Sequence, residues 1–300
     1  MIDAQWLVVG ASVQGAAHVR SGKPGQDAIF WTGPADGYPS VVLAVADGHG
    51  SGKAFRSASG ANFAVRCAAQ QVRGFVEGQI DSASLSAIKR MATEGLPQEI
   101  VKEWTSAVEQ DLAANPLTVL ELQALPDKDR DAVERNPLLA YGSTVLTVAV
   151  TEHFVLYLQL GDGDIVHVSE EGEPTRPLPK DDRLFANETT SLCAPGAWKD
   201  FRVQFQVISE RRPALIMLAT DGYINSYQNE EGFLKVGTDI LKVIREEGPE
   251  KVNQELPGWL TETSEKGSGD DITLGLIVRQ DLSHQQSSFF SKMKDRIIGK

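Results

Sequence analysis

Cysteine is scarce in this sequence, and apolar runs long enough to cross a membrane are missing. Cys67 and Cys193 are the only cysteines, too few for a disulfide framework or a cysteine-based zinc site. The longest apolar segments, such as residues 41–46 and 214–219, have the length of a strand, whereas a transmembrane helix needs ~18 apolar residues. The N-terminus lacks the basic and apolar regions of a signal peptide. We therefore expect a cytoplasmic protein with no transmembrane segment.

Positive charge is also in deficit. Lys and Arg number 29 against 41 Asp and Glu, which gives a formal net charge of −12. Such a surface repels nucleic acids and anionic membranes, so we expect no non-specific binding to either and no nucleic-acid partner. Apolar residues make up 41% of the chain, an ordinary share for a globular protein and too high for a disordered one. The acidic excess suits a protein that gathers carboxylates to bind cations.

The order of the predicted strands and helices indicates the fold class. Segments rich in Val, Ile, Leu and Thr predict strands at 6–12, 41–46, 144–150, 155–160, 215–219 and 272–278. Segments 165–169 and 201–208 alternate more clearly and predict half-exposed strands. Helical periodicity covers 53–76, 84–114 with a break at 95–97, 237–247 and 249–264. Strands and helices that cluster in this way favour an α+β fold over a strictly alternating parallel sheet.

Aspartates stand at the ends of several of these strands. The places are Asp47-Gly48 after 41–46, Asp162 after 156–160, Asp221-Gly222 after 214–220, and Asp270-Asp271 before 272–274. A buried strand is a rigid support for a side chain at its tip, and a glycine after the aspartate lets the backbone turn sharply. One such aspartate is an ordinary turn residue, but several of them predict a shared site.

Carboxylates that meet at one site need a cation. Without one they repel each other and take up protons, and oxygen ligands select hard ions such as Mg²⁺ or Mn²⁺. A structural Ca²⁺ loop is the nearest alternative, but Asp162-Gly163-Asp164 lacks the other spaced ligands and the closing Glu of such a loop. We therefore expect a site for hard divalent cations, with Asp164 as a turn residue only.

Six short motifs occur in the order found in a known family. They are Gly-Gln-Asp-Ala at 25–28, Ala-Asp-Gly-His-Gly at 46–50, Gly-Ser-Thr at 142–144, Gly-Asp at 161–162, Thr-Asp-Gly at 220–222 and Asp-Asp-Ile-Thr at 270–273. With these motifs the sequence resembles the metal-dependent type 2C (PPM) serine/threonine protein phosphatases over roughly residues 5–280, and their bacterial branch in particular. The resemblance implies an α+β fold, a four-layer α-β-β-α sandwich of two packed antiparallel sheets flanked by helices.

The resemblance further implies two Mn²⁺ or Mg²⁺ ions at one end of the sandwich. Asp47 would bridge both ions and the Gly48 carbonyl would bind one of them, while Asp221 and Asp270 would hold the other. Asp162 matches a position that, in many relatives, helps Asp221 to bind a weaker third metal ion. The alternative interpretation of Asp162 is an ordinary loop aspartate.

The catalytic roles implied by the resemblance fall on two further residues. The nucleophile is a water or hydroxide between the metal ions, and Asp27 would act on this water. His49 would protonate the departing Ser or Thr oxygen, a task suited to a group that titrates near neutrality. An exposed turn histidine is the alternative interpretation of His49.

Two departures from the family pattern leave assignments open. Where relatives carry a phosphate-binding Arg this chain has Gly22, and Arg20 reaches that place only if the loop is lengthened. We expect Arg20 to bind phosphate through its guanidinium fork, with Lys23 as the alternative. Many relatives also have Asn where this chain has Asp271, so either Asp270 or Asp271 could be the metal ligand, and we choose Asp270.

Two segments have roles that the sequence leaves open. Residues 1–280 are expected to form one phosphatase domain with a flap-like insertion at about 170–200, which either selects among phosphoproteins or is a plain connecting loop. Residues 281–300 form a basic amphipathic tail. This tail either rests on the domain as a helix or loose end, or contacts a membrane or a partner.

The function expected from these observations is hydrolysis of phosphoserine and phosphothreonine in proteins. The substrate would be a phosphorylated protein, and a separate Ser/Thr kinase or its targets would be the partner of a monomeric enzyme. A pseudophosphatase that binds phosphoproteins without turnover is the alternative, although the retained Asp47, Asp221 and Asp270 argue against it.

Overall fold

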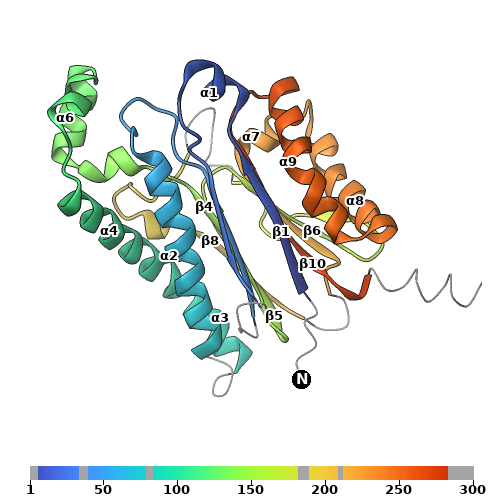
Figure 1. Cartoon of the computed structure of the whole chain (residues 1–300). Helices are drawn as coiled ribbons and strands as arrows, with labels where there is room; N and C mark the ends of the chain where they lie inside the picture. The colour runs from blue at the N-terminus through green and yellow to red at the C-terminus, as the bar shows by residue number, and fades with distance from the viewer. Residues whose placement is uncertain (1–5, 34–39, 79–83, 182–188, 209–211, 283–300) are drawn as a thin grey trace, which may run out of the picture.

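The computed structural model describes residues 6–33, 40–78, 84–181, 189–208 and 212–282, in which ten strands form two antiparallel sheets (Figure 1). The first sheet has the order β1 (Trp6–Val13), β10 (Ile272–Arg279), β9 (Leu215–Ala219), β6 (Asp164–Val168) and β7 (Pro174–Thr175). The second has the order β2 (Ala28–Thr32), β3 (Val41–Ala46), β4 (Val145–Val150), β5 (Phe154–Leu160) and β8 (Arg202–Val207).

The central strands are buried on both faces, and β3 illustrates how their residues divide. Every second residue of β3, namely Val41, Leu43 and Val45, packs into the core between the two sheets. The intervening Val42, Ala44 and Ala46 pack against the helices on the outer face of the second sheet. Because side chains alternate across a strand, one continuous apolar run supplies two separate cores.

Helices cover the outer face of each sheet (Figure 1). The second sheet carries α2 (Ser57–Gly78) and α4 (Leu96–Ala114), and the first sheet carries α8 (Glu230–Glu247) and α9 (Pro249–Lys266). The remaining helices are α1 (Ala16–Ser21), α3 (Leu85–Glu94), α5 (Val119–Gln123), α6 (Asp127–Arg135) and α7 (Asp221–Ile224), with single 3-10 turns η2 (Pro137–Tyr141) and η3 (Ala197–Lys199). The expected four-layer α-β-β-α sandwich is confirmed. Within the described residues no helix is both long and apolar enough to span a membrane.

Most expected elements are present, and the differences have physical causes. Residues 165–169 were expected to be half exposed, but β6 is buried because it lies between β9 and β7 with α8 packed on it. The helix expected to begin at 237 begins at Glu230, after Asn229 caps it by accepting a hydrogen bond from the Gly232 N–H (2.9 Å). The tail at 283–300 and residues 182–188 of the expected flap lie outside the described residues.

Antiparallel pairing brings the aspartate-bearing strand ends to one edge of the sandwich. Strands β3, β5 and β9 end there, and β2, β4, β6 and β10 begin there. The pairs Ala28 with Ala46, Val145 with Leu160, and Asp164 with Ala219 mark this edge, which we call the rim.

Candidate metal centre

Three carboxylates from separate strands form a group at the rim. Asp47 follows β3, Asp162 follows β5, and Asp221 follows β9 as the first residue of α7. Each offers an oxygen atom, and these oxygens lie within 4.8 Å of one another. These three aspartates, far apart in the sequence, therefore come together at one edge of the sandwich, as the sequence analysis expected.

The electrostatics of this group suit a divalent cation. Burial raises the pKa of Asp47 well above its ordinary value, and the charges of Asp27 and Asp221 raise it further. Burial and then the charge of Asp162 raise the pKa of Asp221 to about 6, against the lowering effect of a hydrogen bond with Asp47. A divalent cation among these oxygens would remove the repulsion, and an all-oxygen donor set suits Mg²⁺ or Mn²⁺.

Asp27 lies at the same rim, immediately before β2. The Thr220 hydroxyl donates a hydrogen bond to Asp27 Oδ2 (2.7 Å) and accepts one from the Thr273 N–H (2.9 Å). Burial raises the pKa of Asp27 to about 7, although the Thr220 hydrogen bond opposes this shift. Thr220, which the sequence analysis named only as part of the Thr-Asp-Gly motif and gave no role, therefore holds the Asp27 carboxylate in a fixed orientation.

Asp270 stands next to this group because a glycine lets two segments approach each other. A Cβ on Gly222 would lie 2.1 Å from the Asp271 carbonyl oxygen and 3.2 Å from Asp270 Cβ, so no larger residue fits there. The pKa of Asp221, raised mainly by burial and Asp162, is raised further by the charge of Asp270. Asp270 therefore belongs to the same electrostatic site, although its oxygens form a second group with other neighbours.

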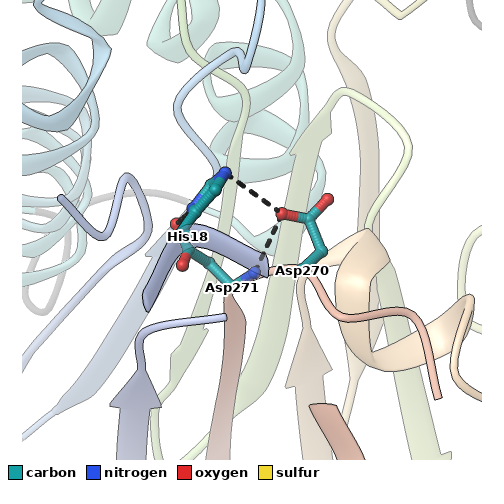
Figure 2. A group of neighbouring side chains, drawn as sticks. All are labelled: His18, Asp270 and Asp271. Carbon is teal, nitrogen blue, oxygen red and sulfur yellow. Dashed lines mark hydrogen bonds and ion pairs between the residues drawn. The ribbon is translucent and has the colours of Figure 1, made fainter. Parts of the chain in front are cut away.

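The second group consists of Asp270, Asp271 and His18 (Figure 2). The sequence analysis identified the two aspartates but missed His18. Asp271 is buried, and its two oxygens accept hydrogen bonds from the Gly15 and Gln26 N–H groups, both at 2.6 Å. Asp270 is 55% exposed. This exposure leaves the Asp270 carboxylate accessible to an ion, which favours Asp270 over Asp271 as a metal ligand. His18 gave no periodicity or motif in the sequence that would have marked it.

His49 lies in the turn after Asp47, packed against the start of β4. The backbone N–H of His49 donates a hydrogen bond to the Gly142 carbonyl (3.0 Å). A Cβ on Gly142 would lie 2.6 Å from His49 Cδ2 and 3.1 Å from Cys193 Sγ, so the imidazole packs closely against this glycine. Burial lowers the pKa of His49, and the charge of Asp162 opposes this effect. The side chain is half-buried rather than freely exposed, which weakens its interpretation as an ordinary turn histidine.

The two candidate phosphate-binding residues lie on and after α1. Arg20 is exposed, and its Nη2 lies 3.9 Å from the position that a Cβ would take on Gly269, so the guanidinium reaches the loop beside Asp270. Lys23 is also exposed, and its backbone N–H donates to the His18 carbonyl (3.0 Å). Both side chains thus belong to the segment that borders the rim.

The Asp164 carboxylate pairs with an arginine. Asp164 begins β6, and its Oδ2 accepts a hydrogen bond from Arg176 Nε (2.6 Å), in an ion pair whose two side chains are each 11% exposed. Because neighbouring aspartates of a Ca²⁺ loop must turn toward one ion, this pairing argues against the Ca²⁺ loop.

The described part of the expected flap lies beside Asp162. The Gly161 N–H donates a hydrogen bond to the Thr190 hydroxyl (2.8 Å). A pocket of about 190 Å³ next to this contact is lined by residues that include Asp162, Lys180, Arg202 and Ile224.

Comparisons with known proteins agree with this geometry. The family model described as protein phosphatase 2C matches residues 14–261. A comparison with curated protein sequences returned no significant match.

Solved structures share the fold at low sequence identity. One is a sex determining protein of C. elegans (18% identity, TM-score 0.53), where the match covers 93% of this chain and 66% of that chain, just under two thirds. Another is the S. agalactiae serine/threonine phosphatase (17% identity, TM-score 0.52), with 91% and 99% covered. A third is the catalytic domain of the serine threonine protein phosphatase PstP in complex with 2 manganese ions (14% identity, TM-score 0.51), with 91% and 97% covered.

Proposed function

This chain belongs to the protein phosphatase 2C family, and from that premise we propose that it is a metal-dependent enzyme that hydrolyses phosphoserine and phosphothreonine in proteins. The observation that carries the proposal is the convergence of Asp47, Asp162 and Asp221 within 4.8 Å of one another. Three converging carboxylates are costly to fold unless a cation compensates them.

We assign two Mn²⁺ or Mg²⁺ ions to Asp47, the Gly48 carbonyl, Asp221 and Asp270, and a weaker third ion to Asp162 with Asp221. Oxygen-only donors support hard cations, and the PstP structure, which shares the fold, contains two manganese ions. When bound, such a pair of ions supplies an acidified water and neutralises charge on the phosphoryl oxygens.

The residues of the chain orient the reactants and move the protons. Asp27, whose Oδ2 accepts a hydrogen bond from the Thr220 hydroxyl, orients the attacking water. His49 donates a proton to the departing Ser or Thr oxygen, and burial, which lowers its pKa, makes it a stronger acid than an exposed histidine. Arg20 binds the phosphate dianion from the α1 side of the site.

The test is hydrolysis of a phosphothreonine peptide with Mn²⁺, with Mg²⁺, and with EDTA. We expect hydrolysis with either ion, loss of activity in EDTA, and recovery when Mn²⁺ is added back. Undiminished hydrolysis in EDTA would contradict the metal mechanism. Binding of the phosphopeptide without hydrolysis under any metal ion would favour the pseudophosphatase alternative.

The role of His49 has its own test. Substitution His49→Gln should slow phosphopeptide hydrolysis by about 10²-fold, the usual size of general-acid catalysis. It should affect p-nitrophenyl phosphate much less, because nitrophenolate leaves without a proton. The exposed His153 lies in the turn between β4 and β5, at the opposite end of these strands from the rim, so His153→Gln is the matched control. Equal losses with both substrates would show that His49 is not the acid.

A further inference from the structure

The His18 imidazole lies between two adjacent carboxylates, one of which is an assigned metal ligand (Figure 2). We propose that His18 is a positioning residue that fixes the orientation of Asp270 for metal binding, with Asp271 as the anchor that holds the imidazole. This inference rests on the proposed function, because it concerns the affinity of the same metal centre.

Asp271 has the properties of an anchor. Its side chain is 3% exposed, and Oδ1 and Oδ2 each accept a backbone N–H at 2.6 Å, from Gly15 and Gln26. These two donors belong to the turn before α1 and to the segment that carries Asp27. His18 Nδ1 lies 3.0 Å from Asp271 Oδ2, a close contact that does not have hydrogen-bond geometry. The imidazole is therefore placed against a carboxylate that the backbone already holds still.

The helix that carries His18 is itself fixed to the last turn of α9 and to the loop before β10. The Ala17 N–H donates to the Gly269 carbonyl (2.8 Å), and the Ala16 N–H donates to the Ser264 hydroxyl (3.0 Å). A Cβ on Gly15 would lie 2.3 Å from the Asp270 carbonyl carbon, so the two segments are in direct backbone contact. A side chain on α1 therefore keeps a constant position relative to Asp270.

The two carboxylate oxygens of Asp270 have different contacts. Oδ1 accepts a hydrogen bond from the Asp271 N–H (2.9 Å) and lies 4.0 Å from His18 Nε2, an electrostatic contact that is longer than a hydrogen bond. Both interactions act on the same oxygen, which leaves Oδ2 to face a cation. Neighbours that orient a metal-binding carboxylate in this way typically change metal affinity by about 10- to 100-fold when they are removed.

Two substitutions of His18 test the roles of its two ring nitrogens separately. The amide nitrogen of Asn replaces Nδ1, which faces Asp271, and the amide nitrogen of Gln replaces Nε2, which faces Asp270. In the full chain, we expect His18→Asn to weaken Mn²⁺ binding, measured by isothermal titration calorimetry, by about 10-fold or more. His18→Gln should restore most of that affinity. The Mn²⁺ concentration that half-activates hydrolysis should shift in parallel, with kcat at saturating Mn²⁺ changed much less.

The controls separate this inference from the proposed function. His153→Gln should bind Mn²⁺ like the unchanged chain, and unfolding in EDTA reports whether a variant has lost stability instead of metal affinity. If the unchanged chain binds no Mn²⁺, both the proposed function and this inference fail. If it binds Mn²⁺ and hydrolyses the phosphopeptide, but Asn and Gln at position 18 weaken binding equally or not at all, only the role of His18 is wrong.

A measurement on the unchanged chain covers the case in which the variants do not fold. With ¹⁵N-labelled histidine, addition of diamagnetic Mg²⁺ should shift the ring-nitrogen signals of His18 and leave those of His153 in place. Saturation of the metal site without any shift at His18 would overturn the inference.

Discussion

Two acidic regions at the same rim behave in opposite ways. Asp47, Asp162 and Asp221 face one another, and burial with mutual repulsion raises the pKa of Asp47 and Asp221. Asp271, the next residue after Asp270, accepts hydrogen bonds from two backbone N–H groups, and His18 Nδ1 lies 3.0 Å from its Oδ2. The difference teaches that the number of carboxylates at a rim does not define a metal site. What defines it is which oxygens the protein leaves without a donor.

Asp164 is a second example of a rim carboxylate that has a partner within the protein. It follows Asp162 by two residues and is equally close to the rim, and burial raises its pKa as well, but here the charge and hydrogen bond of Arg176 oppose the shift. The four predictions below test whether the facing carboxylates and the compensated carboxylates differ as this comparison requires.

The largest effect is expected at Asp221. Asp221→Asn removes a ligand and one of the repelling charges, so phosphopeptide turnover at saturating Mn²⁺ should fall by about 10³-fold or more, equivalent to ~4 kcal/mol of transition-state stabilisation. The variant should unfold in EDTA at the same temperature as the unchanged chain or a higher one. Turnover within about tenfold of the original would place Asp221 outside the metal centre.

Removing the partner of a compensated carboxylate should affect stability instead. Arg176→Met leaves the buried Asp164 charge unpaired, and the free energy of unfolding in urea should fall by about 3 kcal/mol. The double variant Asp164→Asn/Arg176→Met should recover a large part of this loss, because the unpaired charge is gone. Additive losses in the double variant would show that the pair itself is not the cause.

Asp271 should show a smaller loss of the same kind. In Asp271→Asn the amide NH₂ replaces one acceptor oxygen, so one of the two backbone N–H donors stays buried without a partner. The free energy of unfolding in EDTA should fall by about 2 kcal/mol. Asp270→Asn is the matched control, and its metal-free stability should change by less than about 0.5 kcal/mol because its carboxylate is exposed. Equal effects at both positions would remove the distinction between anchor and ligand.

The smallest effect concerns pH. Because the pKa of Asp27 is raised to about 7 and that of Asp221 to about 6, these two carboxyl groups bind more protons in the folded metal-free protein than in the unfolded chain, while the lowered pKa values of His49 and His167 act in the opposite direction. The two carboxyl groups should therefore raise the stability by roughly 1 kcal/mol as pH falls from about 7.5 to about 6. With Mn²⁺ bound the slope should reverse, since protons then compete with the metal ion. Urea unfolding at each pH, with Mn²⁺ or EDTA, gives both slopes, and identical slopes would contradict the assignment of these carboxylates to the metal centre.

Much of the fold was predictable from local patterns. Apolar runs such as 41–46 and 272–278 gave strands because their side chains can be buried on both faces, and the helical periodicity of 84–114 located both α3 and α4 with the break between them. The short β2 was missed because Asp27 and the polar residues before it hide its start, and α1 was missed because six residues are too few for a periodic pattern.

The site was predictable only where a residue type follows a recognisable strand. Asp47, Asp162 and Asp221 each follow an apolar run, so their convergence could be expected from antiparallel pairing. His18 could not be found in this way, and Thr220, although part of a quoted motif, could not be given a role, because both act through contacts with residues 252 and 193 positions away. The choice between Asp270 and Asp271 likewise depends on backbone donors that only the folded chain brings together.

The position of β10 in its sheet has a consequence for how the protein is made. This strand is late in the sequence but sits between β1 and β9, and it carries Asp270 and Asp271 at its start. Pairing β1 with β10 closes a contact across almost the whole described chain, which is a slow step. During synthesis on the ribosome, residues 15–27 therefore wait for β10 to emerge before they can contact Asp270 and Asp271.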